Sequence, residues 1–385
     1  MIVNKNVGNL MRTLITGGAG FIGRHLVEAF LLKGHDVVVL DSMVEQVHGP
    51  AAPEPTYGND IEFIRGDVRS VETVARAAAR VDNVVHLASE TGVGQSMYEV
   101  ARYVDANDHG TAAVLQAVAE RPAQLRRLVL SSSRAVYGEG LYLCPQCGEV
   151  TPPAADRSAS PSWELSCPSC AGDIRVTATH EDAPKDPASV YAATKLQQER
   201  LCAIVGRAYA FSTIALRFFN VYGPGQSLNN PYTGILSTFY SRLSSNSPLN
   251  VYEDGRMLRD FISVRDVVSA VERATEVEES RLEHAVFNVA TGTATTVLDL
   301  AVMLRDLMSS SSEITVTGAY RLGDIRHSIA ETTRAQNELG FKAATSLQDG
   351  LNLWLPWAIE QRTHDKTDEA QAILQSLGLY RAARD

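Results

Sequence analysis

Short apolar runs alternate with amphipathic stretches along the first half of the chain. From Arg12 onward, the runs TLIT, DVVVL, IEFI, NVVHLA and RRLVLSSS are separated by segments with apolar residues three and four positions apart. Apolar runs without polar alternation are typical of strands covered on both faces. The strand and helix order therefore predicts the α/β class: a doubly wound parallel sheet of the Rossmann type, with helices on both faces.

The alternation loosens after about Phe218. Loops rich in Pro, Gly and Asn become frequent, and short strand-like runs (VYE, AVFNVA) lie between helical patterns near 297–308 and 347–360. We predict one lobe over 11–217 and a smaller lobe over 218–362 that is interleaved with returns to the first. The polar stretch 363–385 is expected to be a helical tail.

The composition is that of a folded protein, and it argues against binding to nucleic acid or to a membrane. Of the 385 residues, 45% are hydrophobic and 21% charged, and 45 acidic against 35 basic residues give a net charge of -10. This charge repels polyanions, so we expect no nucleic acid partner. No apolar run reaches membrane-spanning length, and the opening MIVNKNVGNL does not resemble a signal peptide. We expect a cytoplasmic protein without membrane contact.

A glycine-rich turn, TGGAGFIGR, joins the first strand to the first helix. Gly17 permits a tight turn, Gly20 lets the backbone approach a pyrophosphate, and Gly23 lets the helix pack closely on the strand. The helix opens at Phe21 and Ile22, where unpaired N–H groups and a partial positive charge face the phosphates. This arrangement predicts a dinucleotide site.

The second strand ends at Asp41, at the distance expected of a ribose-binding carboxylate. Its oxygens would accept hydrogen bonds from both adenosine ribose hydroxyls and would repel a 2′-phosphate. Because no Arg or Lys follows directly, the sequence favours NAD over NADP.

The segment SVYAATKLQQERL places Tyr191 and Lys195 on one helix face, four residues apart. A nearby ammonium favours the phenolate form of a tyrosine, as would an oxidised nicotinamide, so this pair could act as a base. The spacing is common by itself. It gains specificity from the dinucleotide loop and from LVLSSSRAVYGE, in which Ser133 at a strand end could hold a reacting hydroxyl.

These motifs resemble, in their order, extended short-chain dehydrogenase/reductases of the sugar-nucleotide epimerase/dehydratase family, over about residues 11–357. The resemblance makes 11–217 an NAD-binding domain and 218–362 a sugar-nucleotide-binding lobe. It implies a catalytic triad of Ser133, Tyr191 and Lys195. Cofactor positions implied in addition to the glycine loop and Asp41 are Asp67, Val68, Leu87, Ala88, Ser89, Asn107, Tyr191 and Lys195.

The same resemblance implies a set of substrate contacts. The segments RFFNVYGP, RDFISVRD and RLGDIRH match those that bind the diphosphate and the nucleoside ribose in this family. Arginines suit this role, since a planar bidentate cation matches the geometry of a diphosphate. The residues expected to bind substrate are Ser133, Arg134, Tyr137, Asn220, Arg259, Arg321 and Asp324.

The residues after Ser133 indicate which reaction of the family to expect. Sugar-nucleotide 4,6-dehydratases usually carry Asp-Glu there, since elimination of water needs a further acid and base, whereas this chain has Arg134 and Ala135. We therefore expect NAD-dependent epimerisation at C4 through a transient 4-keto sugar. Loop strings such as EQVHG and YGEGLYLCP are most similar to 6-deoxysugar epimerases of the dTDP-L-rhamnose 4-epimerase type, which favours a dTDP-6-deoxyhexose.

Several alternatives stay open. A UDP-hexose or UDP-uronate 4-epimerase comes next, followed by a 4,6-dehydratase or 4-ketoreductase. Epimerisation at C3 or C5 also stays open. The non-enzyme alternative is a catalytically silent NAD-sensing or scaffold protein that binds a partner through the inserted cysteine segment. Resemblance also implies a homodimer, formed through helices near 97–119 and 191–207.

Two CxxC pairs interrupt this pattern within an insertion over 140–178. Cys144, Cys147, Cys167 and Cys170 have the spacing of a four-thiolate zinc ribbon. Four sulfur ligands leave zinc no open position, so the metal would be structural. The insertion leaves the predicted sheet just after Ser133 and returns just before Tyr191. We therefore expect it near the mouth of the substrate site, as a lid wall or as a contact with a partner subunit. A nucleic-acid ribbon is disfavoured by the acidic residues of this segment.

Overall fold

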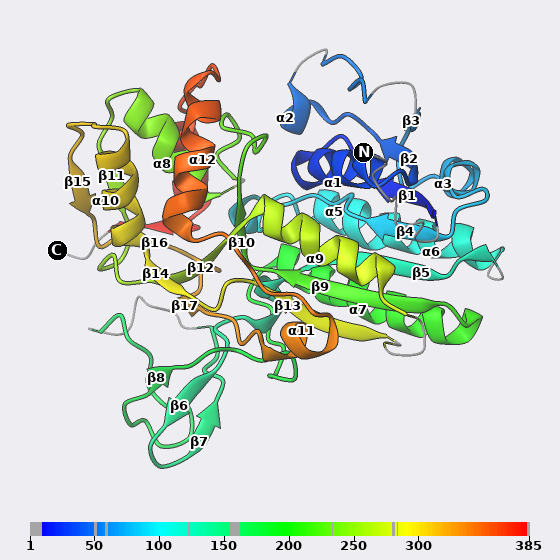
Figure 1. The fold of residues 1–385 in the computed structure, drawn as a ribbon. Helices are drawn as coiled ribbons and strands as arrows, with labels where there is room; N and C mark the ends of the chain where they lie inside the picture. Colours follow the sequence, from blue (N-terminus) through cyan, green and yellow to red (C-terminus); the bar gives the residue numbers. More distant parts are fainter. Residues whose placement is uncertain are drawn as a thin grey trace, which may run out of the picture.

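The computed structural model describes residues 10–49, 52–57, 61–121, 124–154, 162–232, 234–278, 282 and 284–382. Figure 1 shows two lobes side by side, with a small β-rich insertion protruding below them. Within these residues, no helix is both long and apolar enough to cross a membrane.

A seven-stranded parallel sheet forms the centre of the larger lobe. Its strands lie in the order β3 (Ile61–Arg65), β2 (Asp36–Asp41), β1 (Arg12–Thr16), β4 (Asn83–His86), β5 (Arg127–Ser133), β9 (Ser212–Phe218) and β13 (Ala285–Val289). The chain starts near the middle of the sheet, builds one half, and then crosses back past β1 to build the other. The prediction of a Rossmann-type α/β fold is confirmed.

Both faces of this sheet are buried, which explains the unbroken apolar runs. Neighbouring side chains of β1 point to opposite faces: Ile15 lies in a cluster with helices α1 (Phe21–Leu32) and α9 (Val264–Glu276). Leu14 lies in a second cluster with α3 (Val71–Ala77), α6 (Gly110–Ala119) and α7 (Val190–Tyr209). The strand ends therefore sit in a rigid frame.

The smaller lobe packs helices against short strands around its own core. The helices α8 (Ile235–Ser244), α10 (Val297–Leu307) and α12 (Leu347–Ile359) enclose Phe239, Leu300 and Trp354. The strands of this lobe are β10 (Asn220–Tyr222), β11 (Leu249–Val251), β12 (Leu258–Ser263), β14 (Ala294–Thr296), β15 (Ile314–Val316) and β17 (His327–Ser328). Between them the chain returns to the large sheet through α9 and β13.

The C-terminal tail folds back onto the smaller lobe. It forms α13 (Thr367–Ser376) and β18 (Tyr380–Arg381), and β18 pairs with β16 (Tyr320–Arg321). The insertion forms an antiparallel sheet of β6 (Tyr142–Cys144), β7 (Gly148–Val150) and β8 (Arg175–Val176). The remaining elements are α2 (Glu45–His48), α4 (Val93–Ser96), α5 (Val100–Val104), the π-helix Asp105–His109, the 3-10 helix Arg134–Tyr137 and α11 (Thr333–Glu338).

Candidate functional site

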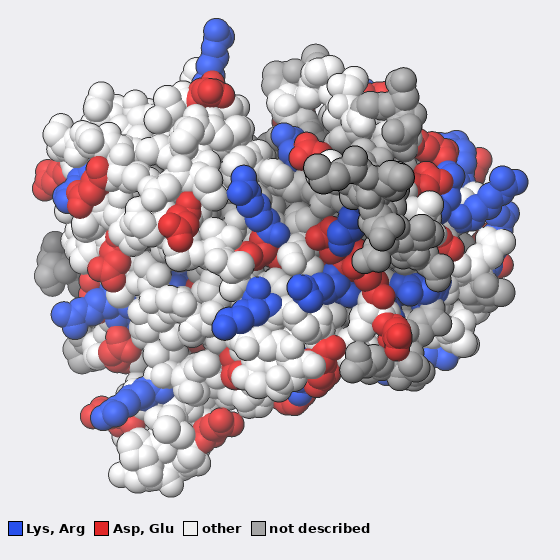
Figure 2. All heavy atoms as spheres, in the orientation of Figure 1, with Lys and Arg blue, Asp and Glu red and all other residues white. Residues whose placement is uncertain are grey.

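A cleft of about 710 Å³ lies between the two lobes, at the carboxyl ends of the large sheet. Ligands of doubly wound folds bind at this edge, where the strand order reverses. The face drawn in Figure 2 carries basic and acidic side chains interspersed among its described residues, rather than gathered into one basic patch.

The glycine loop forms one end of the cleft, and its three glycines have different surroundings. Gly17 has φ +69°, and a Cβ there would lie 2.8 Å from the Ala88 nitrogen. At Gly23 a Cβ would lie 2.3 Å from the Gly17 carbonyl oxygen. Gly20 meets nothing closer than 3.2 Å and caps α1 without a side-chain hydrogen bond. The N–H groups at Phe21 and Ile22 therefore remain available to an anion.

Asp41 lies beside this loop and is 7% exposed. Its carboxylate accepts hydrogen bonds from the backbone N–H groups of Ala19 (3.0 Å) and Met43 (2.8 Å). These bonds fix the carboxylate against the glycine loop, and each oxygen retains a lone pair for a ribose hydroxyl.

Further cofactor candidates line the same end of the cleft. They are Asp67, Val68, Leu87, Ala88 and Ser89. Asn107 differs from the expectation, because it is fully buried and does not line the cleft.

Asn107 instead connects the loop after β4 to helix α7. Its side-chain oxygen accepts hydrogen bonds from the Ser89 hydroxyl (3.0 Å) and the Glu90 N–H (2.8 Å). Its amide group donates to the Thr194 hydroxyl on α7 (3.0 Å). We therefore describe Asn107 as a positioning residue.

The three catalytic candidates meet in the middle of the cleft. Ser133 ends β5, and its hydroxyl lies near enough to that of Tyr191 to affect the pKa of the tyrosine. The Lys195 ammonium, one turn along α7, donates to the Ser131 carbonyl (2.9 Å) and lies 5.9 Å from the centre of the Tyr191 ring. Ser189 caps α7 by accepting from the Ala192 N–H, which sets where the helix starts.

The pKa shifts of this group differ from the expectation that Lys195 acidifies Tyr191. Burial raises the pKa of Tyr191 above its usual 10, and the nearby Ser133 hydroxyl and the charge of Arg134 oppose this rise. Burial also lowers the pKa of Lys195 to about 7. Because both groups are enclosed, the cost of removing charge from water outweighs their mutual effect.

The substrate candidates also line the cleft, and we refer to them as the cationic wall: Arg134, Asn220, Arg259, Arg321 and Asp324. Arg321 is paired with Asp324 (2.9 Å) and lies 5.3 Å from the centre of the Tyr252 ring. Among the described residues, the buried side-chain oxygen of Asn220 has no hydrogen-bond partner. Burial, with the nearby charge of Arg259, lowers the pKa of Arg134 to about 10. This wall presents cationic and amide groups to a ligand.

Tyr137 does not line the cleft, contrary to its expected role as a substrate contact. Its hydroxyl donates to the Asn288 side chain (2.7 Å) and accepts from Arg217 (2.8 Å), inside the larger lobe. The 3-10 helix after Ser133 turns this side chain away from the cleft. Tyr137 therefore joins β9 and β13 through its hydrogen bonds with Arg217 and Asn288.

The C-terminal tail supplies cleft residues that the sequence does not predict. Thr367, Ala370, Gln371 and Leu374 of α13 line the cleft. The sequence shows only a polar helical pattern here, and no motif signals contact with a cleft formed by earlier parts of the chain.

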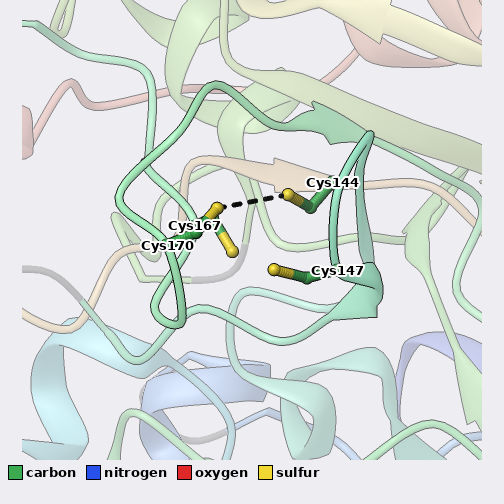
Figure 3. A group of neighbouring side chains, drawn as sticks. All are labelled: Cys144, Cys147, Cys167 and Cys170. Atoms are coloured by element: carbon green, nitrogen blue, oxygen red, sulfur yellow. Dashed lines mark hydrogen bonds between the residues drawn. The ribbon is translucent and has the colours of Figure 1, made fainter.

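The insertion brings its four cysteines together, as Figure 3 shows. All four sulfur atoms lie within 4.8 Å of one another, and those of Cys144 and Cys170 are 3.6 Å apart. The expectation of a lid wall is corrected, because no described residue of the insertion lines the cleft. The insertion packs outside the smaller lobe, next to β17.

Comparisons with known proteins agree with this geometry. Residues 13–290 match the NAD dependent epimerase/dehydratase family. The chain is 32% identical to a dTDP-L-rhamnose 4-epimerase from Burkholderia thailandensis, over 93% of this chain and 98% of that protein. It is 30% identical to a UDP-glucose 4-epimerase from Mycolicibacterium smegmatis, over 89% and 96% of the two chains.

Solved structures give the same result. MoeE5 in complex with UDP-glucuronic acid and NAD is 31% identical, with a TM-score of 0.72 over 90% of this chain and 99% of that one. The UDP-glucose 4-epimerase of Thermus thermophilus, in complex with NAD, is 26% identical, with a TM-score of 0.73 over 91% and 100% of the two chains. With its parallel sheet, glycine loop and cleft, this chain belongs to the NAD dependent epimerase/dehydratase family.

Proposed function

We propose that this chain holds NAD in the cleft and inverts C4 of a nucleotide-diphosphate sugar through a transient 4-keto sugar, with a dTDP-6-deoxyhexose as the preferred substrate. One observation carries the proposal: Ser133, Tyr191 and Lys195 line the same cleft as the glycine loop, Asp41, Arg259 and Arg321. The two relatives named above by sequence are both 4-epimerases.

The residues of the chain divide the proton chemistry between them. Ser133 holds the sugar 4-hydroxyl, and the Tyr191 oxygen takes its proton and later returns it. Lys195 is fixed by the Ser131 carbonyl, and in its protonated form it supplies a positive charge that opposes the effect of burial and favours the Tyr191 phenolate. NAD, when bound, supplies a reversible hydride acceptor for C4. No net reductant is consumed.

The cationic wall accounts for binding of the diphosphate. Arg259 and Arg321 present planar, permanently charged groups, and the unpaired Asn220 oxygen can accept a hydrogen bond from the ligand. A catalytically silent NAD sensor would need neither this wall nor Ser133, Tyr191 and Lys195 together in the cleft.

A second candidate, UDP-uronate 4-epimerisation, is favoured by one observation. Arg134 lies in the cleft near enough to Tyr191 for its charge to affect that hydroxyl. A cation there could bind the C6 carboxylate of a uronate, whereas a 6-deoxy sugar offers only a methyl group. MoeE5, which resembles this chain, was solved with UDP-glucuronic acid.

The test is turnover of a panel of dTDP-, UDP-, GDP- and CDP-sugars, followed by NMR, with transient absorbance of the reduced cofactor. We expect C4 inversion of a dTDP-6-deoxyhexose with the highest kcat/KM. Arg134→Gln should then leave this substrate ahead of the uronate. A wild-type preference for UDP-uronate that Arg134→Gln abolishes would support the second candidate instead. A panel without any C4 inversion contradicts both.

We also propose that the four cysteines bind one structural zinc ion. A tetrahedral site with Zn–S bonds of about 2.3 Å separates its sulfur atoms by about 3.8 Å, and the thiols here are close to that arrangement. Cysteine thiolates are ligands that zinc prefers, and free thiols suit a reducing compartment such as the cytoplasm. Metal analysis of the purified protein should find about one zinc per chain.

A homodimer is proposed on the exposed apolar side chains of two helices in contact, α5 and α7. Val100 and Val104 are 46% and 42% exposed, and Ile204 is 57% exposed. Large apolar groups on adjacent helices are typical of an interface. Light scattering should give twice the mass of the chain.

A further inference from the structure

The segment that follows β16 connects the insertion to the cationic wall of the cleft. This segment, 322–331, carries Asp324, which lines the cleft. On its outer side it contacts three parts of the chain around the insertion: Glu139, Glu164 and Thr179. We refer to it as the anchored segment.

Glu164 makes the contact that is specific to the insertion. Its carboxylate accepts hydrogen bonds from two guanidinium nitrogens of Arg326, at 2.5 and 3.2 Å. The other carboxylate oxygen lies 3.1 Å from the Nε2 atom of His327. The side chain of Arg326 is fully buried, and Glu253 and Asp254 bind its remaining N–H groups. Three carboxylates thus fix one arginine, and only Glu164 among them comes from the insertion.

The backbone of the anchored segment is bound as well. Glu139 accepts a hydrogen bond from the Arg326 N–H (2.7 Å). Thr179 donates its N–H to the Ile329 carbonyl (2.9 Å), and its own carbonyl accepts from the Glu331 N–H (3.0 Å). The segment therefore has little freedom to move away from the cleft.

Arg259 depends directly on this backbone. Its guanidinium donates to the carbonyl of Arg326 (2.9 Å) and to that of Ile325 (2.8 Å). Arg259 lines the cleft and is 8% exposed. Any shift of these two carbonyls would move the cation that faces the ligand.

Glu164 lies on the segment that leads directly into the cysteine site. Glu164 lies three residues before Cys167, which is 3% exposed. The turn after Cys167 is closed by backbone hydrogen bonds from Cys167 to Gly172 (2.9 Å) and from Ala171 to Cys167 (2.8 Å). The neighbouring Trp163 packs edge-on against Tyr320, with ring centres 6.1 Å apart. A metal bound by the four thiolates would hold this whole turn against the anchored segment.

We propose that the four-cysteine site is a metal-dependent positioning element for the diphosphate-binding wall: it fixes Glu164, which fixes Arg326, whose backbone aims Arg259 into the cleft. The inference rests on the zinc site and the sugar-nucleotide site proposed above. It assigns the insertion an effect on ligand affinity, transmitted through the protein, without contact between metal and substrate.

The test compares the wild-type protein with three variants: Glu164→Gln, Cys167→Ser with Cys170→Ser, and Glu149→Gln as the control. Glu149 is a matched control, because it is an exposed carboxylate of the same insertion that faces His180 at 3.6 Å. The readouts are zinc per chain, the Kd of UDP and dTDP by calorimetry, the Kd of NAD, and KM and kcat for the sugar nucleotide.

Glu164→Gln should retain zinc and raise the nucleotide Kd and KM about fivefold, the scale of a partly exposed ion pair. The double cysteine variant should lose zinc and show at least the same increase, while Glu149→Gln should match the wild type. NAD affinity should stay within about twofold throughout, because the glycine loop lies at the other end of the cleft.

Two results would overturn the inference. One is a Glu164→Gln variant with the nucleotide affinity of Glu149→Gln, a comparison that holds even where the cysteine variant does not fold. The other is a folded cysteine variant that has lost zinc and keeps wild-type affinity. A wild-type protein that binds UDP or dTDP but converts no sugar contradicts the proposed reaction alone, since the binding data still test the positioning role.

Discussion

The residues in and around the cleft differ in how far along the chain their partners lie. The glycine loop, Asp41 and the pair of Tyr191 and Lys195 follow from short-range geometry, because each motif lies within one turn or one helix. The roles of Tyr137 and Asn107 depend on partners 151 and 87 residues away, Asn288 and Thr194. Sequence spacing carries no information about such contacts.

Lys195 makes a testable contribution to the pH dependence of stability. Its pKa is lowered to about 7 in the fold by burial, against 10.5 for an exposed lysine. Between these two values the unfolded chain binds a proton that the folded chain lacks, so the free energy of unfolding rises with pH. The stability difference between the wild type and Lys195→Met should therefore shift in favour of the wild type from pH 7 to pH 10. Urea titrations at several pH values check this, and a constant difference would contradict it.

The buried pair of Arg217 and Glu199 links β9 to helix α7. Arg217 binds the Glu199 carboxylate through two nitrogens, at 2.9 and 2.7 Å, and both side chains are less than a tenth exposed. Arg217→Met leaves Glu199 buried without its partner and should cost about 3–5 kcal/mol of stability.

The double variant Arg217→Met, Glu199→Met is the control for that prediction. It should recover much of the loss, because no unpaired charge remains. Equal instability of the single and double variants in urea titrations would show that packing, and not the unpaired charge, causes the loss.

At the scale of elements, the sequence predicts what each segment is better than where it lies. The apolar periods of α1, α6 and α7 indicate helices, and the CxxC spacing indicates a compact knuckle. The position of the insertion outside the smaller lobe could not be predicted, because it depends on ion pairs such as that of Glu164 with Arg326, 162 residues apart. The polar pattern of α13 likewise predicts a helix without its place along the cleft.

Helix α13 gives the prediction that belongs to this scale. Gln371 lines the cleft and accepts a hydrogen bond from the Tyr252 hydroxyl (3.4 Å), whereas Gln375, one turn further, is exposed. Gln371→Ala should raise KM for the sugar nucleotide about threefold to tenfold, the effect of losing one or two neutral hydrogen bonds. Gln375→Ala should leave it unchanged. Steady-state kinetics that show no difference between the two variants would remove α13 from the site.

At the scale of the whole molecule, the order of elements determines where chemistry can occur. Strands β1, β2, β4 and β5 end at one edge of the sheet, which gathers the glycine loop, Asp41 and Ser133. The chain then returns through α9 and β13, so that the smaller lobe is attached by several crossings and faces this edge. The α/β fold and the family could be predicted from the sequence, whereas the shape of the cleft required the relative placement of both lobes.

The central claim is that the Tyr191 oxygen transfers the proton of the sugar hydroxyl, and Tyr191→Phe tests it most directly. Tyr209→Phe, at the exposed end of the same helix, is the control. We expect kcat for Tyr191→Phe to fall by a factor of about 100 to 10,000, the usual contribution of general acid–base catalysis, with NAD still bound and Tyr209→Phe unaffected. A Tyr191→Phe variant that keeps the wild-type kcat would contradict the account.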